Sequence, residues 1–153
     1  MPLTLNGSCQ CGGVQFSLQS HTPVPYQLCA CSICRKVGGY NGSVNLGGLN
    51  DTMKIAKGKD MIKKYHGICD RGTPTERTVE SIRAFCSACG SMLWVYDSSW
   101  PKLIHPFASA IDSPLEPPEE MVCVKADSKP DWVRWPEGQK QIYQDYGPDS
   151  IDG

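Results

Sequence analysis

The sequence predicts an all-β fold, a complex β-sandwich of several small antiparallel sheets. Two observations support this prediction. Short segments with strand-like patterns follow one another between turns rich in Gly and Pro, as in sandwiches and barrels. No amphipathic helix longer than two turns stands out among the 153 residues. With 40% hydrophobic and 20% charged residues, the chain has the composition of an ordinary globular domain.

The predicted strands follow one another along the chain. Residues 14–18 alternate apolar and polar side chains, which indicates a strand with one buried face. Residues 92–96 are apolar on both faces and indicate a central strand. Short segments, several of them bounded by Gly or Pro, predict the other strands at 26–29, 40–46, 52–56, 61–65, 79–85 and 103–108, and extend the central strand to 91–96. The helix candidates are one turn over 31–37 and a second segment over 138–146.

A polar, proline-rich stretch over 112–120 predicts a loop, because proline fixes φ and cannot donate to a sheet. We expect the tail after it to pack onto the core through Trp132 and Trp135. The sequence predicts one domain over 1–153, with a core over about 5–135 and a partly flexible tail over 136–153. The last residues, 147–153, are expected to fray.

Nine cysteines are the largest deviation in composition. Cysteines one or two residues apart on a tight turn can both reach a zinc ion about 2.3 Å from each sulfur, whereas such pairs are poor candidates for disulfides. The absence of a recognisable export signal predicts a cytoplasmic protein, in which disulfides do not persist. Seven of the nine are therefore candidate metal ligands: Cys9, Cys11, Cys29, Cys31, Cys34, Cys86 and Cys89.

Seven ligands make one closed site of four sulfurs and one site of three sulfurs with an open position. Glycines directly after Cys11 and Cys89 tolerate the positive φ of a zinc knuckle, whereas Arg35 follows Cys34. We therefore expect the groups at 9–11 and 86–89 to share a structural zinc that clips the N-terminal strand to a later hairpin. The group at 29–34 remains for a second, catalytic zinc, although the spacing alone leaves other pairings open. Cys69 and Cys123 are expected to be free thiols. The alternative is that one of them is a fourth ligand that closes the second site.

The ordered set C-x-C-G-G at 9–13, C-A-C-S-I-C-R-K at 29–36 and F-C-S-A-C-G-S at 85–91 resembles the glutathione-dependent formaldehyde-activating enzyme family. That family includes the centromere protein V domain, and the resemblance runs from about residue 8 to residue 132. It implies a β-sandwich of several sheets, a structural zinc on the first and last groups and a catalytic zinc on the middle group. It also implies carbon–sulfur lyase activity, originally on S-hydroxymethylglutathione. No residue that would hold glutathione is evident in this chain.

A zinc ion on three thiolates keeps a position for a substrate thiolate, a water or a carbonyl oxygen. We therefore predict a zinc-dependent carbon–sulfur lyase acting on a small thiol adduct, with two Zn²⁺ per chain and glutathione as co-substrate by the family resemblance. Arg35 is the candidate for contact with an anionic substrate and His66 the candidate for proton transfer, each with a purely structural role as the alternative. Two other functions stay open: zinc-dependent elimination, cyclisation or isomerisation of a small specialised metabolite, and a non-catalytic, zinc-stabilised binding module.

The charge balance limits the partners. The chain has 15 Lys and Arg against 16 Asp and Glu, a net charge of −1, so it has no general attraction for nucleic acid or anionic lipid. Its longest apolar runs are only a few residues, far below a membrane span. We expect a small-molecule substrate, no nucleic-acid or membrane partner, and a monomer or homodimer.

Overall fold

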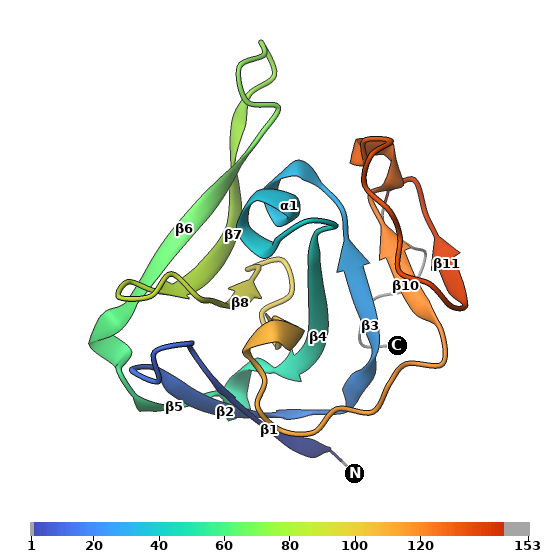
Figure 1. Cartoon of the computed structure of the whole chain (residues 1–153). Coiled ribbons are helices and arrows are strands. Elements are labelled where there is room, and N and C mark those ends of the chain that lie inside the picture. The colour runs from blue at the N-terminus through green and yellow to red at the C-terminus, as the bar shows by residue number, and fades with distance from the viewer. Residues whose placement is uncertain (1, 146–153) are drawn as a thin grey trace.

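The computed structural model describes residues 2–145, and most of its regular structure is β-strand (Figure 1). This confirms the predicted all-β class. In chain order the elements are β1 (Leu3–Ser8), β2 (Gln15–Ser20), β3 (Thr22–Cys29), α1 (Ser32–Gly38), β4 (Ser43–Leu49), η1 (Asn50–Thr52), β5 (Lys54–Lys57), η2 (Lys59–Met61), β6 (Ile62–Cys69), β7 (Arg77–Cys86), β8 (Met92–Tyr96), β9 (Leu103–Pro106), η3 (Ala108–Ala110), β10 (Met121–Val124), η4 (Ala126–Ser128) and β11 (Lys140–Ile142).

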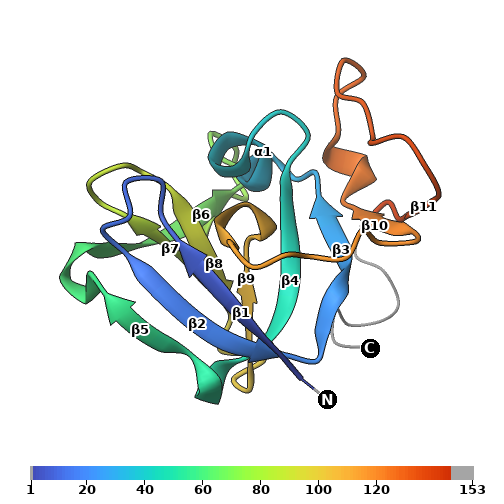
Figure 2. The same cartoon turned by 60° about the horizontal axis from the view of Figure 1, so that its bottom comes forward.

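The strands form a small sheet and a large one. The small sheet is antiparallel, in the order β1-β2-β5, and the large sheet runs β11-β10-β3-β4-β9-β8-β7-β6. Figure 2 shows the small sheet lying across one face of the large one. Between them lies the main core, to which both sheets contribute buried side chains, for example Leu5 and Leu18 from the small sheet and Leu46 and Leu93 from the large one. Strand β8 lies between β7 and β9, so the prediction of a central strand is confirmed.

One edge of the large sheet differs from the prediction. β10 pairs in parallel with both β3 and β11, although only antiparallel sheets were expected. The predicted helix over 138–146 is wrong in its described part, because 140–142 is strand β11 and residue 146 lies outside the described residues. The Tyr143 N–H donates to the Cys123 carbonyl at 2.9 Å, next to the paired strands. Pairing with β10 outweighs helix propensity because an isolated helix of this length is marginal.

The tail after the proline-rich loop attaches differently from the prediction. Trp132 is 67% exposed, so it does not pack into the core as expected. The buried residue is its neighbour Val133, while Trp132 packs against the Tyr40 ring at a centroid distance of 6.0 Å. The Tyr40 hydroxyl donates to the Trp132 carbonyl at 2.8 Å and accepts from the Arg134 N–H at 2.9 Å. The expected fraying over 147–153 falls outside the described residues.

The short helix α1 confirms the helical turn predicted over 31–37, and the large sheet curves around it (Figure 1). A glycine on β6 permits the close approach, since a Cβ on Gly67 would lie 2.8 Å from the Ile33 Cδ1 of α1. At the other end of the helix, a Cβ on Gly38 would lie 2.8 Å from the Ser43 Cβ of β4. The sheet thereby holds α1 and its cysteine close to β4, β6 and β7. Within residues 2–145, no helix is long and apolar enough to cross a membrane.

Candidate metal centres

Four cysteines meet where a hairpin turn of the small sheet faces a hairpin turn of the large sheet. Cys9 and Cys11 lie between β1 and β2, while Cys86 ends β7 and Cys89 lies in the turn before β8. The Cys11 Sγ is 3.5 Å from the Cys9 Sγ and 3.9 Å from the Cys86 Sγ, and all four sulfurs lie within 4.8 Å of one another. Tetrahedral Zn–S bonds of about 2.3 Å place sulfurs ~3.8 Å apart. The spacing of this group therefore fits a zinc ion.

Both turns have the backbone geometry that the glycine pattern predicts. Gly12 has φ +75° and Gly90 has φ +77°. The Gly12 N–H donates to the Cys9 carbonyl at 3.0 Å, and the Gly90 N–H donates to the Cys86 carbonyl at 2.8 Å. No atom lies within 4 Å of a Cβ built on either glycine, so the requirement for glycine is conformational rather than steric.

Two exposed cysteines of this group have opposite acidities in the metal-free protein. The pKa of Cys89 is lowered to about 5, first because the Ser91 hydroxyl hydrogen-bonds to its sulfur, with backbone N–H groups adding to the effect. For Cys11, the Gly13 N–H lowers the pKa, but hydrogen bonding with the Cys9 and Cys89 thiols together outweighs it and raises the pKa to about 11. Within the group, Cys89 is thus the more acidic of the two exposed thiols.

The other three clustered cysteines meet at the start of α1. Cys29 ends β3, Cys31 caps the helix and Cys34 lies in its first turn. The Cys31 sulfur accepts from the Cys34 N–H at 3.3 Å, and all three sulfurs lie within 4.8 Å of one another. Cys29 and Cys34 are buried, whereas Cys31 is partly exposed. The change from strand to helix within six residues therefore directs three thiols toward one point.

The structure thus groups the seven cysteines as four and three, in the combination that the sequence analysis expected. Among the His, Cys, Asp and Glu side chains of residues 2–145, none joins the three-cysteine group as a fourth ligand. Cys123 is buried in β10, and burial raises its thiol pKa. Cys69, at the end of β6, also lies outside both groups. The metal occupancy of either group stays a prediction.

A buried cation that the sequence analysis did not single out touches the three-cysteine group. Arg83 of β7 is 8% exposed, and its Nη2 donates to the Cys34 Sγ at 3.4 Å. The pKa of Cys34 is lowered to about 2, first through hydrogen bonds with the Cys29 and Cys31 thiols, against the opposing effect of burial; Arg83 and Ser43 lower it further. The available signal in the sequence was a charged residue between apolar neighbours in a predicted strand.

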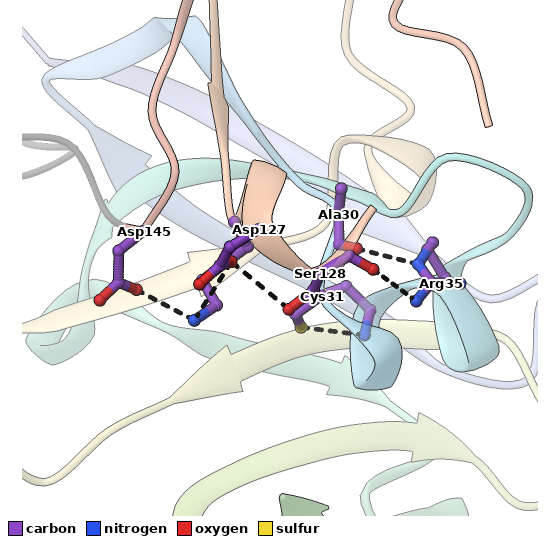
Figure 3. A network of polar contacts seen from close by, with 8 residues as sticks. Ala30, Cys31, Arg35, Asp127, Ser128 and Asp145 are labelled. Carbon is purple, nitrogen blue, oxygen red and sulfur yellow. Dashed lines mark hydrogen bonds and ion pairs between the residues drawn. The ribbon is translucent and has the colours of Figure 1, made fainter. Parts of the chain in front are cut away.

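Arg35, the predicted contact for an anionic substrate, is held by backbone carbonyls. Its Nε donates to the Ala30 carbonyl at 2.9 Å and its Nη2 to the Ser128 carbonyl at 3.1 Å, which ties α1 to the C-terminal segment (Figure 3). The same figure shows the polar contacts continuing from Ser128 to Asp127, whose carboxylate accepts from the Ser128 hydroxyl at 3.5 Å. A catalytic role for Arg35 stays a prediction.

His66, the predicted proton-transfer residue, is exposed on β6, with its Nδ1 3.1 Å from the Val79 carbonyl oxygen. It pairs with Ile82, the neighbour of Arg83 along β7. Because side chains alternate along a strand, His66 faces the opposite side of the sheet from Arg83 and Cys34. Its catalytic role also stays a prediction, and the structure does not bring it to the three-cysteine group.

A cavity of about 820 Å³ opens beside the start of β4. It lies between the turn from α1 to β4, the two cysteine-bearing hairpin turns and η3, and Ser43, Phe107 and Asp112 are among its lining residues. Ser43 is buried, and its hydroxyl makes no hydrogen bond of good geometry although it lies close enough to the Cys34 thiol to lower its pKa. The volume is in the range of pockets that hold small molecules, roughly 300–1,000 Å³.

Three comparisons relate the chain to known proteins. The family model described as "Glutathione-dependent formaldehyde-activating enzyme" matches residues 4–125. A Halomonas elongata protein named "Putative glutathione-dependent formaldehyde-activating enzyme" is 47% identical over 133 residues, which cover 86% of this chain and 80% of that protein. A crystal structure of a Rhodobacter sphaeroides protein superposes with a TM-score of 0.56 at 19% identity, covering 74% of this chain and 97% of the other, and shows a shared fold.

Proposed function

Because the chain belongs to the glutathione-dependent formaldehyde-activating enzyme family, we propose that it is a zinc-dependent carbon–sulfur lyase acting on a small thiol adduct. The family name and the name of the Halomonas elongata relative support an adduct of glutathione as the substrate class. The four-cysteine group holds a structural zinc that joins the two sheets. The three-cysteine group holds the catalytic zinc.

The observation that carries the proposal is the three-cysteine group without a fourth ligand in the described part of the chain. Structural zinc sites are closed by four protein ligands, whereas catalytic sites keep one position for substrate. A zinc ion bound there would supply a Lewis acid that stabilises a substrate thiolate or polarises a carbonyl oxygen.

The surroundings of the group set how a substrate approaches. Cys29 and Cys34 are buried against Val124 of β10, and Cys31 is partly exposed, so the group is accessible from the Cys31 side. Burial of the other two sulfurs keeps water away from them, and it strengthens the hydrogen bond between the Arg83 guanidinium and one of them, the Cys34 sulfur. These features favour a reaction at a protected thiolate site.

The test is a zinc count combined with an activity assay. We expect native mass spectrometry and metal analysis to find two zinc ions per wild-type chain. Cys31→Ser is expected to leave a folded protein with one zinc and no turnover of the formaldehyde–glutathione adduct. Cys69→Ser is the matched control, because Cys69 lies outside both groups, and it should keep both zinc ions and the activity.

A wild-type protein with one zinc per chain would overturn the catalytic-zinc proposal. Two zinc ions together with equal turnover of formaldehyde in the presence and absence of glutathione would overturn the proposal that the substrate is an adduct of glutathione. Two zinc ions with no turnover of any adduct, together with a stoichiometric macromolecular partner, would point to the binding module instead.

A further inference from the structure

Arg83 carries a buried positive charge without a carboxylate partner. It is 8% exposed, and no Asp or Glu of residues 2–145 lies within the 4.0 Å of an ion pair. Its Nη1 is fully buried and makes no hydrogen bond, while its Nη2 donates to the Cys34 Sγ at 3.4 Å. Burying an unpaired charge costs several kcal/mol, so buried charges in folded proteins are paired. The group that Arg83 contacts must therefore supply the negative charge.

The sheet register shows that the placement is built into the fold. Arg83 pairs with Tyr65 of β6 on one side and with Val95 of β8 on the other, and Val95 pairs with His105 of β9. These partners share the face of the sheet against which α1 packs. None of these three side chains is acidic, and the recorded side-chain contact of the guanidinium is with the Cys34 sulfur.

We infer that Arg83 is the counter-charge of the three-cysteine centre and that its hydrogen bond to Cys34 positions and tunes that centre. This inference rests on the proposed catalytic zinc. Three thiolates and one Zn²⁺ carry one net negative charge, which the guanidinium neutralises. A neutral fourth ligand, such as a water or a carbonyl oxygen, leaves the buried centre uncharged. Arg83 thus acts through Cys34 as a positioning residue and does not itself contact the substrate.

The hydrogen bond has a second consequence for the sulfur. A donor N–H on a thiolate withdraws electron density from it, so Cys34 donates less charge to a bound metal. The metal then remains a stronger Lewis acid than three unmodified thiolates would allow. The four-cysteine group also has hydrogen bonds to its sulfurs, from the Val14 N–H to Cys9 and between the Ser91 hydroxyl and Cys89, but neither of these partners is a charged side chain.

The experiment measures metal binding without substrate, so it can fail independently of the lyase proposal. Arg83→Met removes the charge and keeps the apolar stem, and Arg83→Lys keeps the charge. We expect Arg83→Met to bind the second zinc about 10- to 100-fold more weakly in a competition titration with a chromophoric chelator. We expect Arg83→Lys to recover most of that loss. Native mass spectrometry counts the four-cysteine zinc in the same sample as an internal control.

Cobalt substitution gives a spectroscopic readout that a purely structural role would not change. The sulfur-to-cobalt charge-transfer band of the second site is expected to move to longer wavelength in Arg83→Met and part of the way back in Arg83→Lys. Arg77→Met is the matched control, because Arg77 lies on the same strand but is exposed and paired with Asp70. That variant should leave both the affinity and the spectrum unchanged.

Each result decides the inference. Wild-type zinc affinity and an unchanged cobalt band in Arg83→Met would overturn it, even if the wild-type enzyme turns over the adduct. Should Arg83→Met fail to fold, Arg83→Gln, which keeps a donor and loses the charge, takes its place with the same expected loss. A wild-type chain that binds only the four-cysteine zinc would overturn both the inference and the catalytic-zinc proposal.

Discussion

Gly42 and Gly39 form a natural pair for testing how the fold positions Cys29. Both lie in the turn between α1 and β4 and have similar positive φ values, +123° for Gly42 and +128° for Gly39. No atom lies within 4 Å of a Cβ built on Gly39, whereas a Cβ on Gly42 would lie 1.9 Å from the Cys29 carbonyl oxygen. Gly39→Ala therefore introduces backbone strain alone, and Gly42→Ala introduces strain at a similar φ together with a collision.

The expected magnitudes follow from this difference. A non-glycine residue in such a conformation costs about 1–3 kcal/mol, which lowers the melting temperature of a chain this size by roughly 3–10 °C. Since Cβ atoms do not approach other atoms closer than 3.0 Å, Gly42→Ala must also move the backbones of Gly42 and Cys29 apart by about 1 Å. Metal ligands tolerate errors of only about 0.2 Å. We expect Gly42→Ala to lose more than about 4 kcal/mol and the second zinc.

The assay combines thermal unfolding by circular dichroism with zinc counting on both variants. Gly39→Ala should melt a few degrees below wild type and keep two zinc ions. Gly42→Ala should melt well below Gly39→Ala and keep at most one. If the two variants melt within about 2 °C of each other and hold equal zinc, the close approach of the Gly42 turn to Cys29 does not position that ligand.

Three further predictions concern other parts of the molecule. Cys86→Ser should lose the structural zinc and unfold or aggregate, seen in solubility and circular dichroism, because a structural zinc contributes directly to folding; a soluble, native-like variant would reverse the roles of the two groups. In chelated protein that still has the native circular dichroism spectrum, iodoacetamide at pH 7 should alkylate Cys89, with its pKa of about 5, faster than Cys11, with its pKa of about 11, by peptide mass spectrometry. Folding lowers the pKa of the Cys89 thiol from 9.0 to about 5, so its thiolate stabilises the folded state. This stabilisation is complete above pH 9.0 and is lost as the pH falls through about 5. Arg35→Ala should lower the unfolding free energy by about 1–3 kcal/mol, because it removes two hydrogen bonds donated by a charged group. Lys36→Ala, at an exposed neighbour, is the control and should have little effect. Equal denaturation midpoints for the two variants would contradict the stabilising role of the contact between α1 and the C-terminal segment.

Several elements could be predicted because their causes are local. Alternation over 14–18 corresponds to β2, the apolar run at 92–96 to β8, and the predicted turn over 31–37 to α1. Close cysteine spacing and a following glycine are also local properties, since they depend on turn geometry. The positive φ at Gly12 and Gly90 confirms that part of the reasoning. Strands β10 and β11 were missed because they are short and because β10 joins the sheet by parallel pairing with a distant strand, β3.

By itself, the sequence determined the all-β class, the family and the three close groups of cysteines, because neighbours along the chain carry that information. Which of these groups combine is a matter of tertiary structure, and the fold joins 9–11 with 86–89 as expected. The tertiary structure alone decided which charge reaches the second group. Arg35 follows Cys34 directly, yet its guanidinium is held by the carbonyls of Ala30 and Ser128. Arg83, 49 positions away from Cys34, contacts its sulfur because β7 lies in the curved sheet against which α1 packs. A buried cation needs an anion in space rather than in sequence, and only the folded chain shows where the two meet.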